Sequence, residues 1–574
     1  MTKSKEEIIE EMFEKGVLIS EDFLKKEENQ SSDNKFTGKI EAEEDLLVLN
    51  SDYAEVIKQQ TSLVDWHELD SLKVGSEKER NDDLYQNELQ QLKKSELVLQ
   101  NSNTSKETSS LEVELNVEEN GATTSTTTET KSEELIESSM NVIELNESEK
   151  NNLAMLKNVE IVFSYTNIPF KYKINDFGNI FRSRYKCLEK LLRNRQELRS
   201  TLTINRILGK KEKEKVSIIG VIEDVGTTRS GHIMLTLEDL TGKIKVLVSK
   251  NNKDLFPLAK ELVYDEVIGI TGNCGDKIIF ANNIIWPDIP ETNEMRKGNK
   301  EEYAIFLSDL HVGSNVFLED EFNKFLRWIQ GDTGNDKQRE LANKVKYIII
   351  AGDLVDGIGI YPTHEEDLKI KDIKKQYEEV VRLIKKIPLN KKIIVCPGNH
   401  DLVHLAEPQP VFYPEYTQCL YDQPNVIVVS NPAMINIGKT EDFSGFNILM
   451  YHGCSFDYYV ANVESIRNNG GYHRADLIMK FLLKRRHLAP AFKSVPYFPG
   501  HKEDPLLIKT IPDFFVTGHI HYSKVANYKG VTMISGSCWQ AKTSFQEKLG
   551  HEPEPARVPV VNLKTREVKI LKFV

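Results

Sequence analysis

The fold is decided by one stretch in the last half of the chain, which reads Val345-Lys346-Tyr347-Ile348-Ile349-Ile350-Ala351-Gly352-Asp353-Leu354-Val355-Asp356. Its first part is a largely apolar run with the length of a buried β-strand, and two carboxylates follow that run. Further apolar runs alternate with amphipathic segments from residue 297 to residue 574. This alternation predicts an α/β domain, in which ligands gather at the carboxyl ends of the strands.

Four more polar motifs follow runs that read as strands: Asp309-Leu310-His311, Gly398-Asn399-His400-Asp401, His452-Gly453 and Gly518-His519-Ile520-His521. Each motif is weak by itself, because such short patterns occur by chance. Together they would bury many ionisable groups, which costs several kcal/mol per group unless a cation compensates. Carboxylates, imidazoles and one amide at strand ends are what a two-metal hydrolytic site requires. The sequence therefore predicts a dinuclear metal centre.

The bulk properties narrow the class of protein. A chain of 574 residues predicts roughly three to four domains. It contains no apolar run of about 18 residues, and its N-terminus leads into an acidic amphipathic stretch, so a cytoplasmic protein without a membrane partner is expected. The six cysteines form no CxxC pair, which argues against a zinc knuckle and a disulfide framework.

The net charge of -13 is unevenly distributed. Residues 1–150 carry 16 Lys and Arg against 37 Asp and Glu, whereas the remainder carries 59 basic against 51 acidic residues. This asymmetry is compatible with a polyanion-binding body that carries an acidic arm, and equally with a solubility effect.

Two N-terminal regions precede the body. Residues 1–75 are predicted to be a small helical interaction region, because Ser4-Lys5-Glu6-Glu7 fits a capping box and apolar faces follow it. This region either docks onto a partner or packs locally. Residues 76–150 are acidic, rich in Ser, Thr and Glu and poor in aromatic residues, which predicts a disordered linker.

Residues 151–205 are predicted to form a strand near Val159–Phe163 and a basic helix over Phe177–Ser200, capped by Asp176. The basic face of this helix contacts either nucleic acid or solvent. Residues 206–292 contain five short strand runs with a helix-like stretch after the third, which predicts an OB-type barrel. Only Trp286 and Phe280 are good candidates for stacking on bases, which favours protein docking over single-strand binding.

The complete set of motifs resembles the calcineurin-like metallophosphoesterases. Several longer segments also resemble the small subunits of archaeal family-D DNA polymerases: Gly352–Pro362, Ala406–Pro410, Lys484–Pro490 and Trp539-Gln540. The resemblance covers about residues 155–574. It implies that the domain at residues 297–574 is a β-sandwich flanked by helices, with the OB-type barrel before it.

The resemblance also implies a role for each motif residue. One metal ion would be bound by Asp309, His311, Asp353 and His521, and a second by Asp353, Asn399, His452 and His519. His400 would be the general acid, with Asp356 holding its imidazole, and Asp401 would lie behind the ligands. Ligands of nitrogen and oxygen without thiolate suit Mn²⁺ better than Mg²⁺, while Fe and Zn stay open.

Other residues are candidates for contacts with DNA or with a partner subunit. His404 closely follows the third motif and is a candidate for substrate contact. The basic trio Lys484, Arg485 and Arg486 would contact DNA phosphates or a partner, and Trp539 would anchor an interface.

By this resemblance the chain is expected to be a 3′→5′ exonuclease that proofreads primer 3′ ends. It would also be a scaffold for a separate large polymerase subunit in the nucleoid. The sliding clamp and other replication factors are further expected partners. One alternative is a catalytically silent scaffold, against which the complete ligand set argues. Another is a free-standing phosphodiesterase.

Overall fold

The computed structural model describes residues 18–19, 48–49, 158–167, 171–210, 214–499, 503–549 and 551–574. The chain divides into two units, residues 1–135 and 136–574, which are described separately. In the first unit, β1 (Leu18–Ile19) pairs in parallel with β2 (Val48–Leu49). This pairing corrects the helix predicted around Leu18–Ile19, because an extended segment with a β-branched residue gains ladder hydrogen bonds there. The rest of the predicted helical region and the linker at residues 76–150 lie outside the described residues.

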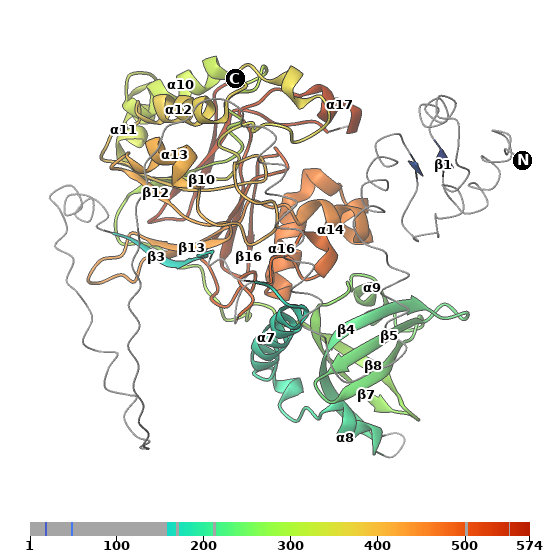
Figure 1. The fold of residues 1–574 in the computed structure, drawn as a ribbon. Coiled ribbons are helices and arrows are strands. Elements are labelled where there is room, and N and C mark those ends of the chain that lie inside the picture. The colour runs from blue at the N-terminus through green and yellow to red at the C-terminus, as the bar shows by residue number, and fades with distance from the viewer. Residues whose placement is uncertain are drawn as a thin grey trace, which may run out of the picture. The chain divides into compact units, whose positions relative to one another are not determined.

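The predicted barrel is confirmed. Its strands close in the order β4-β5-β6-β8-β7, with α9 (Leu255–Ala259) between the third and fourth strands in sequence. Alternate residues of β5 are buried, as expected where one face of each strand fills a barrel core. The barrel is drawn in green in Figure 1. Its strands are β4 (Lys215–Thr227), β5 (Ile233–Asp239), β6 (Gly242–Val248), β7 (Val267–Cys274) and β8 (Ile278–Ile285).

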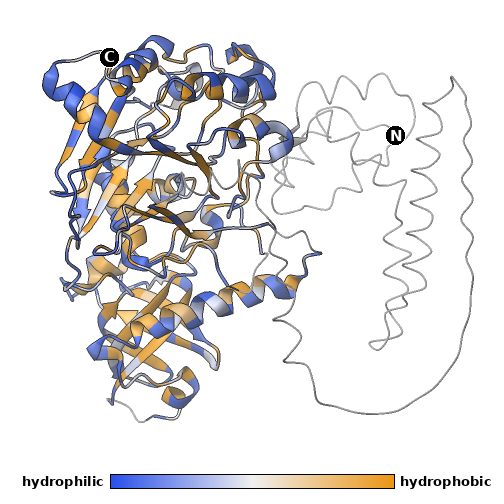
Figure 2. Cartoon of the chain, turned by 90° about the vertical axis from the view of Figure 1, so that its left-hand side faces the viewer, coloured by the Kyte–Doolittle hydropathy of each residue, from blue (hydrophilic) through white to orange (hydrophobic). Residues whose placement is uncertain are grey.

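Two six-stranded sheets make up the body of the second unit, and all of their strands except β3 follow the barrel in sequence. The first sheet, in spatial order, is β12 (Val426–Val428), β11 (Lys392–Cys396), β10 (Val345–Ala351), β9 (Tyr303–Leu307), β18 (Arg557–Asn562) and β19 (Val568–Lys572). The second is β16 (Lys524–Tyr528), β17 (Val531–Ser535), β15 (Phe514–Thr517), β14 (Phe446–Met450), β13 (Ala433–Ile437) and β3 (Val159–Ser164). Apolar side chains from both sheets, such as Phe306 and Phe514, share one core. The sheets therefore form a β-sandwich, and most of their strands are orange in Figure 2.

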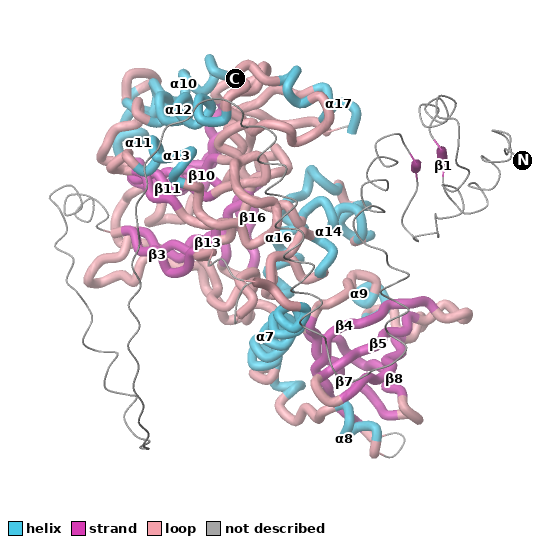
Figure 3. Tube along the Cα trace, viewed as in Figure 1, coloured by secondary structure: helices cyan, strands magenta, loops and turns pink. Residues whose placement is uncertain are grey.

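Helices cover the outer faces of the sandwich (Figure 3). Those on the first sheet are α10 (Glu319–Gln330), α11 (Asp336–Lys344), α12 (Ile373–Ile384) and α13 (Pro414–Tyr421). Those on the second sheet are α14 (Phe456–Asn462), α15 (Glu464–Asn468) and α16 (Ala475–Arg485). The sequence also forms α8 (Ile204–Leu208) and α17 (Ser544–Leu549). Among the described residues, no helix combines the length and the apolar character needed to cross a membrane.

The segment before the barrel contacts both the second sheet and the barrel. Strand β3 pairs antiparallel with β13 at the edge of the second sheet. Helix α7 (Ile174–Leu192) packs Tyr185 and Leu188 against apolar residues on the outside of the barrel. The helix starts earlier than predicted, because Asp176 lies inside its first turn and accepts from the backbone N–H of Lys173 at 2.7 Å. It also ends sooner than predicted, at Leu192.

Candidate metal centre

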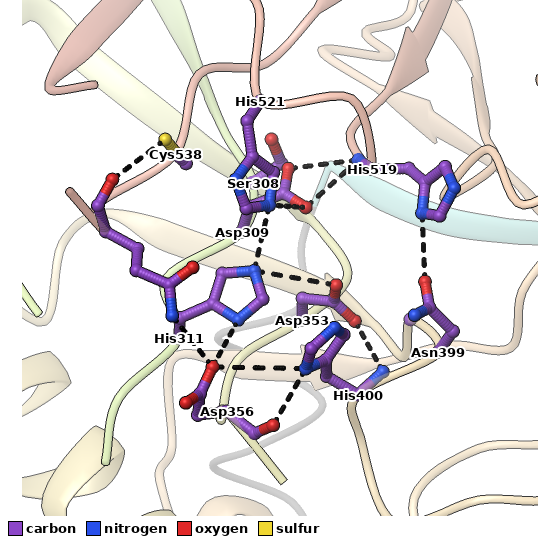
Figure 4. A network of polar contacts seen from close by, with 12 residues as sticks. Ser308, Asp309, His311, Asp353, Asp356, Asn399, His400, His519, His521 and Cys538 are labelled. Carbon is purple, nitrogen blue, oxygen red and sulfur yellow. Dashed lines mark hydrogen bonds and ion pairs between the residues drawn. The ribbon is translucent and has the colours of Figure 1, made fainter. Parts of the chain in front are cut away.

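The polar motifs of both sheets meet at one edge of the sandwich. Strands β9, β10 and β11 run parallel in the first sheet, and β14 and β15 run parallel in the second. Because the carboxyl ends of parallel strands lie at the same edge, the residues that follow these strands are brought together. Figure 4 shows side chains from four of the five motifs lying close to one another. His452, from the fifth motif, lies 3.2 Å from the carboxylate of Asp353.

The backbone at this edge is strained and tightly packed. Five of the expected ligands have positive φ angles: Asp309 (51°), His311 (51°), Asp353 (52°), His519 (71°) and His521 (55°). Such conformations are costly for residues other than glycine and cluster at functional sites. A Cβ atom added to Gly398 would lie 2.2 Å from Oδ1 of Asp353, so only glycine permits this approach. The fold therefore gives up local stability to bring these groups together.

The first ligand set contains Asp309, His311 and His521, which offer atoms within 4.8 Å of one another. Nε2 of His311 lies 3.0 Å from Nε2 of His521, and the latter lies 3.5 Å from Oδ1 of Asp309. Nδ1 of His311 is 2.9 Å from Oδ1 of Asp356, so this nitrogen carries the proton in the neutral ring. Its Nε2 then presents a lone pair to the other imidazole.

The second set contains Asp353, Asn399, His452 and His519. Nδ1 of His452 donates to the carbonyl of Ala351 at 2.8 Å, which leaves its Nε2 as an acceptor in the neutral ring. That Nε2 lies 3.2 Å from Oδ2 of Asp353 and 3.0 Å from Oδ1 of Asn399. Nδ1 of His519 is also 3.0 Å from this amide oxygen. In both sets, carboxylate or amide oxygens converge with imidazole nitrogens, and this is a ligand set that divalent cations fit.

The pKa values of these groups reflect the crowding of carboxylates and imidazoles at this site. Burial opposes ionisation of Asp353, yet His452 and His400 hold the pKa of its carboxyl well below the usual range. Burial alone would lower the pKa of His452, but the Asp353 carboxylate raises that pKa to about 10. Without a metal ion, protons on imidazole compensate the buried carboxylates, and a bound cation would replace them.

His400 is held differently from the prediction. Its Nδ1 lies 2.8 Å from the backbone carbonyl oxygen of Asp356, whereas the nearer carboxylate oxygen is 3.9 Å away. The main chain of Asp356 therefore orients the imidazole, and its carboxylate serves another purpose. Burial lowers the pKa of His400 to about 4. The ring is thus neutral near pH 7, with a bare Nε2.

A second layer of side chains surrounds the ligands, and sequence reasoning misses parts of it. The Asp356 carboxylate accepts from Gln540 at 2.9 Å and contacts Nε2 of His364 at 3.2 Å, in addition to His311. His364 lies in no motif, so no signal in the sequence assigns it a role. Asp457 contacts Nε2 of His519 at 2.9 Å. These contacts fix ring orientations behind the centre, as second-layer partners of metal ligands do.

Asp401 ties two motif loops together. Its Oδ2 accepts from the backbone N–H groups of Gly398 at 2.9 Å and Leu354 at 3.2 Å, and its Oδ1 accepts from the hydroxyl of Tyr377 at 3.1 Å. Burial raises the pKa of Asp401 to about 7. The residue therefore supports the loops that carry Asp353 and Asn399 and offers no free oxygen to a metal ion.

Comparison with known proteins identifies the family. Residues 304–525 match the family of B subunits of DNA polymerases alpha and epsilon, and residues 216–277 match "OB-fold nucleic acid binding domain". The "DNA polymerase II small subunit" of Methanothermobacter thermautotrophicus is 40% identical over 402 residues, which cover 70% of this chain and 80% of the relative. The chain belongs to the family of archaeal DNA polymerase II small subunits.

Two further relatives of the same name support this assignment. The small subunit of Pyrococcus furiosus is 36% identical over 74% of this chain and 70% of its own length. That of Archaeoglobus fulgidus is 40% identical over 67% of this chain and 75% of its own length. The similarity therefore includes the barrel as well as the sandwich, since either alone would cover a smaller share of the chain.

The predicted basic contact surface of this small subunit is wrong. Arg485 is buried, and its Nε lies 2.7 Å from Oε2 of Glu266, the residue before β7. Arg486 is buried as well and donates to the carbonyl of Ile508 at 2.8 Å. The ammonium of Lys484 lies 3.7 Å from the ring centroid of Trp286. Lys484 and Arg485 join the sandwich to the barrel, and Arg486 is held within the sandwich domain. These three side chains and the buried Trp286 are therefore engaged within the protein.

Three other contact candidates are engaged in contacts within the protein. Trp539 is fully buried against Phe322 and Phe325 of α10, which corrects its assignment as an interface anchor. Arg184 of α7, one of the basic residues expected to face nucleic acid or solvent, is buried and pairs with Asp504 at 2.7 Å. His404 stacks on Phe498 with ring centroids 4.9 Å apart, and its Nδ1 lies 2.7 Å from the carbonyl oxygen of Ala406. No contact between His404 and the ligand sets occurs in the described residues.

Proposed function

We propose that this chain is the metal-dependent 3′→5′ proofreading exonuclease of an archaeal family-D DNA polymerase and a scaffold for its large subunit. In this proposal, the sandwich is a calcineurin-like metallophosphoesterase domain. The observation that carries the proposal is the pair of adjoining ligand sets, because Oδ2 of Asp353 lies 3.7 Å from Nε2 of His311 in one set and 3.2 Å from Nε2 of His452 in the other. Complete ligand sets favour an enzyme over a catalytically silent scaffold.

The two ligand sets have the composition that two divalent cations require. Asp309, His311 and His521 would hold one ion, Asn399, His452 and His519 the other, and Asp353 both. The absence of thiolate among these groups favours Mn²⁺ over softer metal ions, as for other sites of imidazole and carboxylate. When bound, the ions would activate water and neutralise charge on the phosphoryl oxygens.

The protein itself contributes orientation and a proton carrier. The backbone N–H of His400 donates to Oδ1 of Asp353 at 2.8 Å, so the ring of His400 is fixed beside the shared carboxylate. Its Nε2 is the atom that would carry a proton to the leaving oxygen of a cleaved phosphodiester. Because the free ring is neutral near pH 7, it would take up this proton as the anionic substrate binds.

The family assignment supports the proposed partners. A small subunit implies a large catalytic subunit, and we propose this chain binds one, together with the sliding clamp and the primer 3′ end. The barrel is the second element that supports a role beside DNA, since its family description is a nucleic-acid-binding domain.

The test is degradation of an oligonucleotide with a mismatched 3′ end by the full chain, alone and with the large subunit, in Mn²⁺. A label at the 5′ end reports the polarity of degradation. We expect Asp353→Asn and His400→Ala to remove activity, and Asp336→Asn, whose side chain is 98% exposed, to retain it. Activity that persists in Asp353→Asn would refute the site. Tight binding of the large subunit without any nuclease activity would favour the scaffold.

A further inference from the structure

An exposed apolar pair lies directly beside the candidate centre. Ile358 is 45% exposed and Ile360 is 37% exposed, in the loop that follows Asp356. Neither side chain belongs to an apolar core of the described residues. Two exposed aliphatic side chains on one short loop offer a small apolar surface next to a charged site, and such a surface is suited to an apolar group of a ligand.

Side-chain hydrogen bonds hold both ends of the loop that carries the two isoleucines. Gln376 brackets its start, because its Oε1 accepts from the N–H of Gly357 at 2.9 Å and its Nε2 donates to the carbonyl of Gly357 at 3.0 Å. The hydroxyl of Tyr361 donates to Asp367 at 2.8 Å at the other end. A Cβ atom on Gly359 would meet no atom within 4 Å, so the tip between the isoleucines stands in open space.

The start of this loop is packed against the candidate proton carrier. The carbonyl oxygen of Asp356 contacts Nδ1 of His400, and a Cβ atom on Gly357 would lie 2.3 Å from the carbonyl oxygen of His400. Ile358 follows Asp356 by two residues, which places the two Cα atoms within about 7 Å of each other. The isoleucine pair therefore lies on the loop next to His400, within reach of a ligand whose phosphodiester is bound there.

We propose that Ile358 and Ile360 form an apolar platform for the unpaired bases at the 3′ end of a single DNA strand. This inference rests on the proposed function. A nucleotide is the ligand that combines a phosphodiester for the centre with a flat apolar surface one sugar away. Apolar side chains contact every base alike, so binding would not depend on sequence.

The platform selects for unpaired ends. Bases inside a duplex are stacked on each other and cannot also cover the isoleucines, so a paired end would have to unstack first. A mismatched end has less stacking to lose. The loop would therefore favour the frayed ends that a proofreading nuclease has to remove.

The test compares the full chain with the double variant Ile358→Ser, Ile360→Ser. Leu389→Ser is the matched control, because Leu389 is 55% exposed but precedes β11 at the opposite end of the same sheet. Three probes are used in Mn²⁺: a single-stranded oligonucleotide, the same strand with two abasic residues at its 3′ end, and bis(4-nitrophenyl) phosphate. Binding of both strands is also measured by fluorescence anisotropy in Ca²⁺.

We expect the double variant to raise the KM for the normal strand about tenfold while kcat stays within about twofold, as loss of contacts to bases predicts. With the unmodified chain, the KM for the abasic strand should be higher than that for the normal strand by a similar factor. The double variant should raise the KM for the abasic strand no further, because both changes remove the same interaction. Turnover of bis(4-nitrophenyl) phosphate and all results with Leu389→Ser should be unchanged.

Equal binding of the normal strand by the unmodified chain and the double variant would overturn the inference. The inference would also be overturned if the effects of the double variant and of the abasic residues on KM multiplied when the variant acts on the abasic strand. Loss of binding to the large subunit with unchanged DNA kinetics would identify a protein as the occupant and would overturn it too. Failure of the proposed function looks different: binding would depend on the isoleucines and on the bases, and no probe would be hydrolysed.

Discussion

Replacing Asp356 with asparagine tests which part of this residue serves the centre. Its carbonyl oxygen contacts His400 and survives the substitution, whereas its carboxylate, which contacts His311, His364 and Gln540, does not. The pKa of this carboxyl is held far below its usual range, because His311 and His364 outweigh the effect of burial. The variant therefore removes a buried charge from behind a metal ligand and leaves the orientation of His400 intact.

The expected magnitude follows from the contacts of the two carboxylate oxygens. Oδ1 faces His311 and Gln540, and an asparagine oxygen can replace it there. Oδ2 faces Nε2 of His364, whose Nδ1 accepts from the N–H of Ile360 at 3.3 Å, so Nε2 carries the proton and would confront the amide NH₂. One hydrogen bond and one charge are lost. Such changes behind a metal ligand lower metal affinity about 10–100-fold, which is about 1.4–2.8 kcal/mol.

The assay is exonuclease rate on a single-stranded oligonucleotide as a function of Mn²⁺ concentration. We expect Asp356→Asn to shift the half-saturating Mn²⁺ concentration upwards about 10–100-fold and to recover most of kcat at saturation. If the carboxylate oriented His400 instead, kcat would fall by about 10²–10⁴ at every metal concentration. A saturated rate that stays this low would refute the assignment of the main-chain carbonyl.

Three further predictions follow from buried contacts. Glu266→Gln leaves the buried guanidinium of Arg485 without its carboxylate partner, so it should lower the free energy of unfolding by about 3–5 kcal/mol. The double variant Glu266→Gln, Arg485→Met should lower the free energy of unfolding much less. Urea denaturation followed by tryptophan fluorescence measures both. Gly398→Ala should abolish Mn²⁺ binding in calorimetry, since its Cβ would displace Asp353, while Gly226→Ala, which meets no atom within 4 Å, should bind normally. Burial, together with Arg184, lowers the pKa of His487 from 6.5 to about 4. In this pH range the unfolded chain binds a proton at His487 and the folded chain does not, so the stability should fall as the pH drops from about 6.5 to about 4. Thermal denaturation of His487→Gln should show a smaller dependence of stability on pH over this range. An equal dependence in the variant would contradict the assignment of the effect to His487.

The parts of the fold that could be predicted are those that depend on patterns of neighbouring residues in the sequence. The run before Gly352, and its counterparts before Asp309 and His519, are continuous apolar stretches, so their strands and the polar groups after them could be placed. The five strands of the barrel were equally visible. Which surface each charged residue faces could not be read in this way. Arg485 pairs with Glu266, more than two hundred positions away, and a basic trio looks the same whether or not such a partner exists.

The burial of these arginines changes how the centre would recognise DNA. The mildly basic charge after residue 150 suggested an electrostatic surface, yet Arg184, Arg485, Arg486 and Arg566 are all buried inside the second unit. Their charges are balanced by Asp504 and Glu266 or shared with backbone carbonyls, so they release no counterions from a DNA backbone. These four arginines therefore add nothing to the salt dependence of any DNA binding by the chain. If the proposed function holds, attraction for DNA phosphates near the centre therefore has to come from the metal ions or from basic residues outside this buried set.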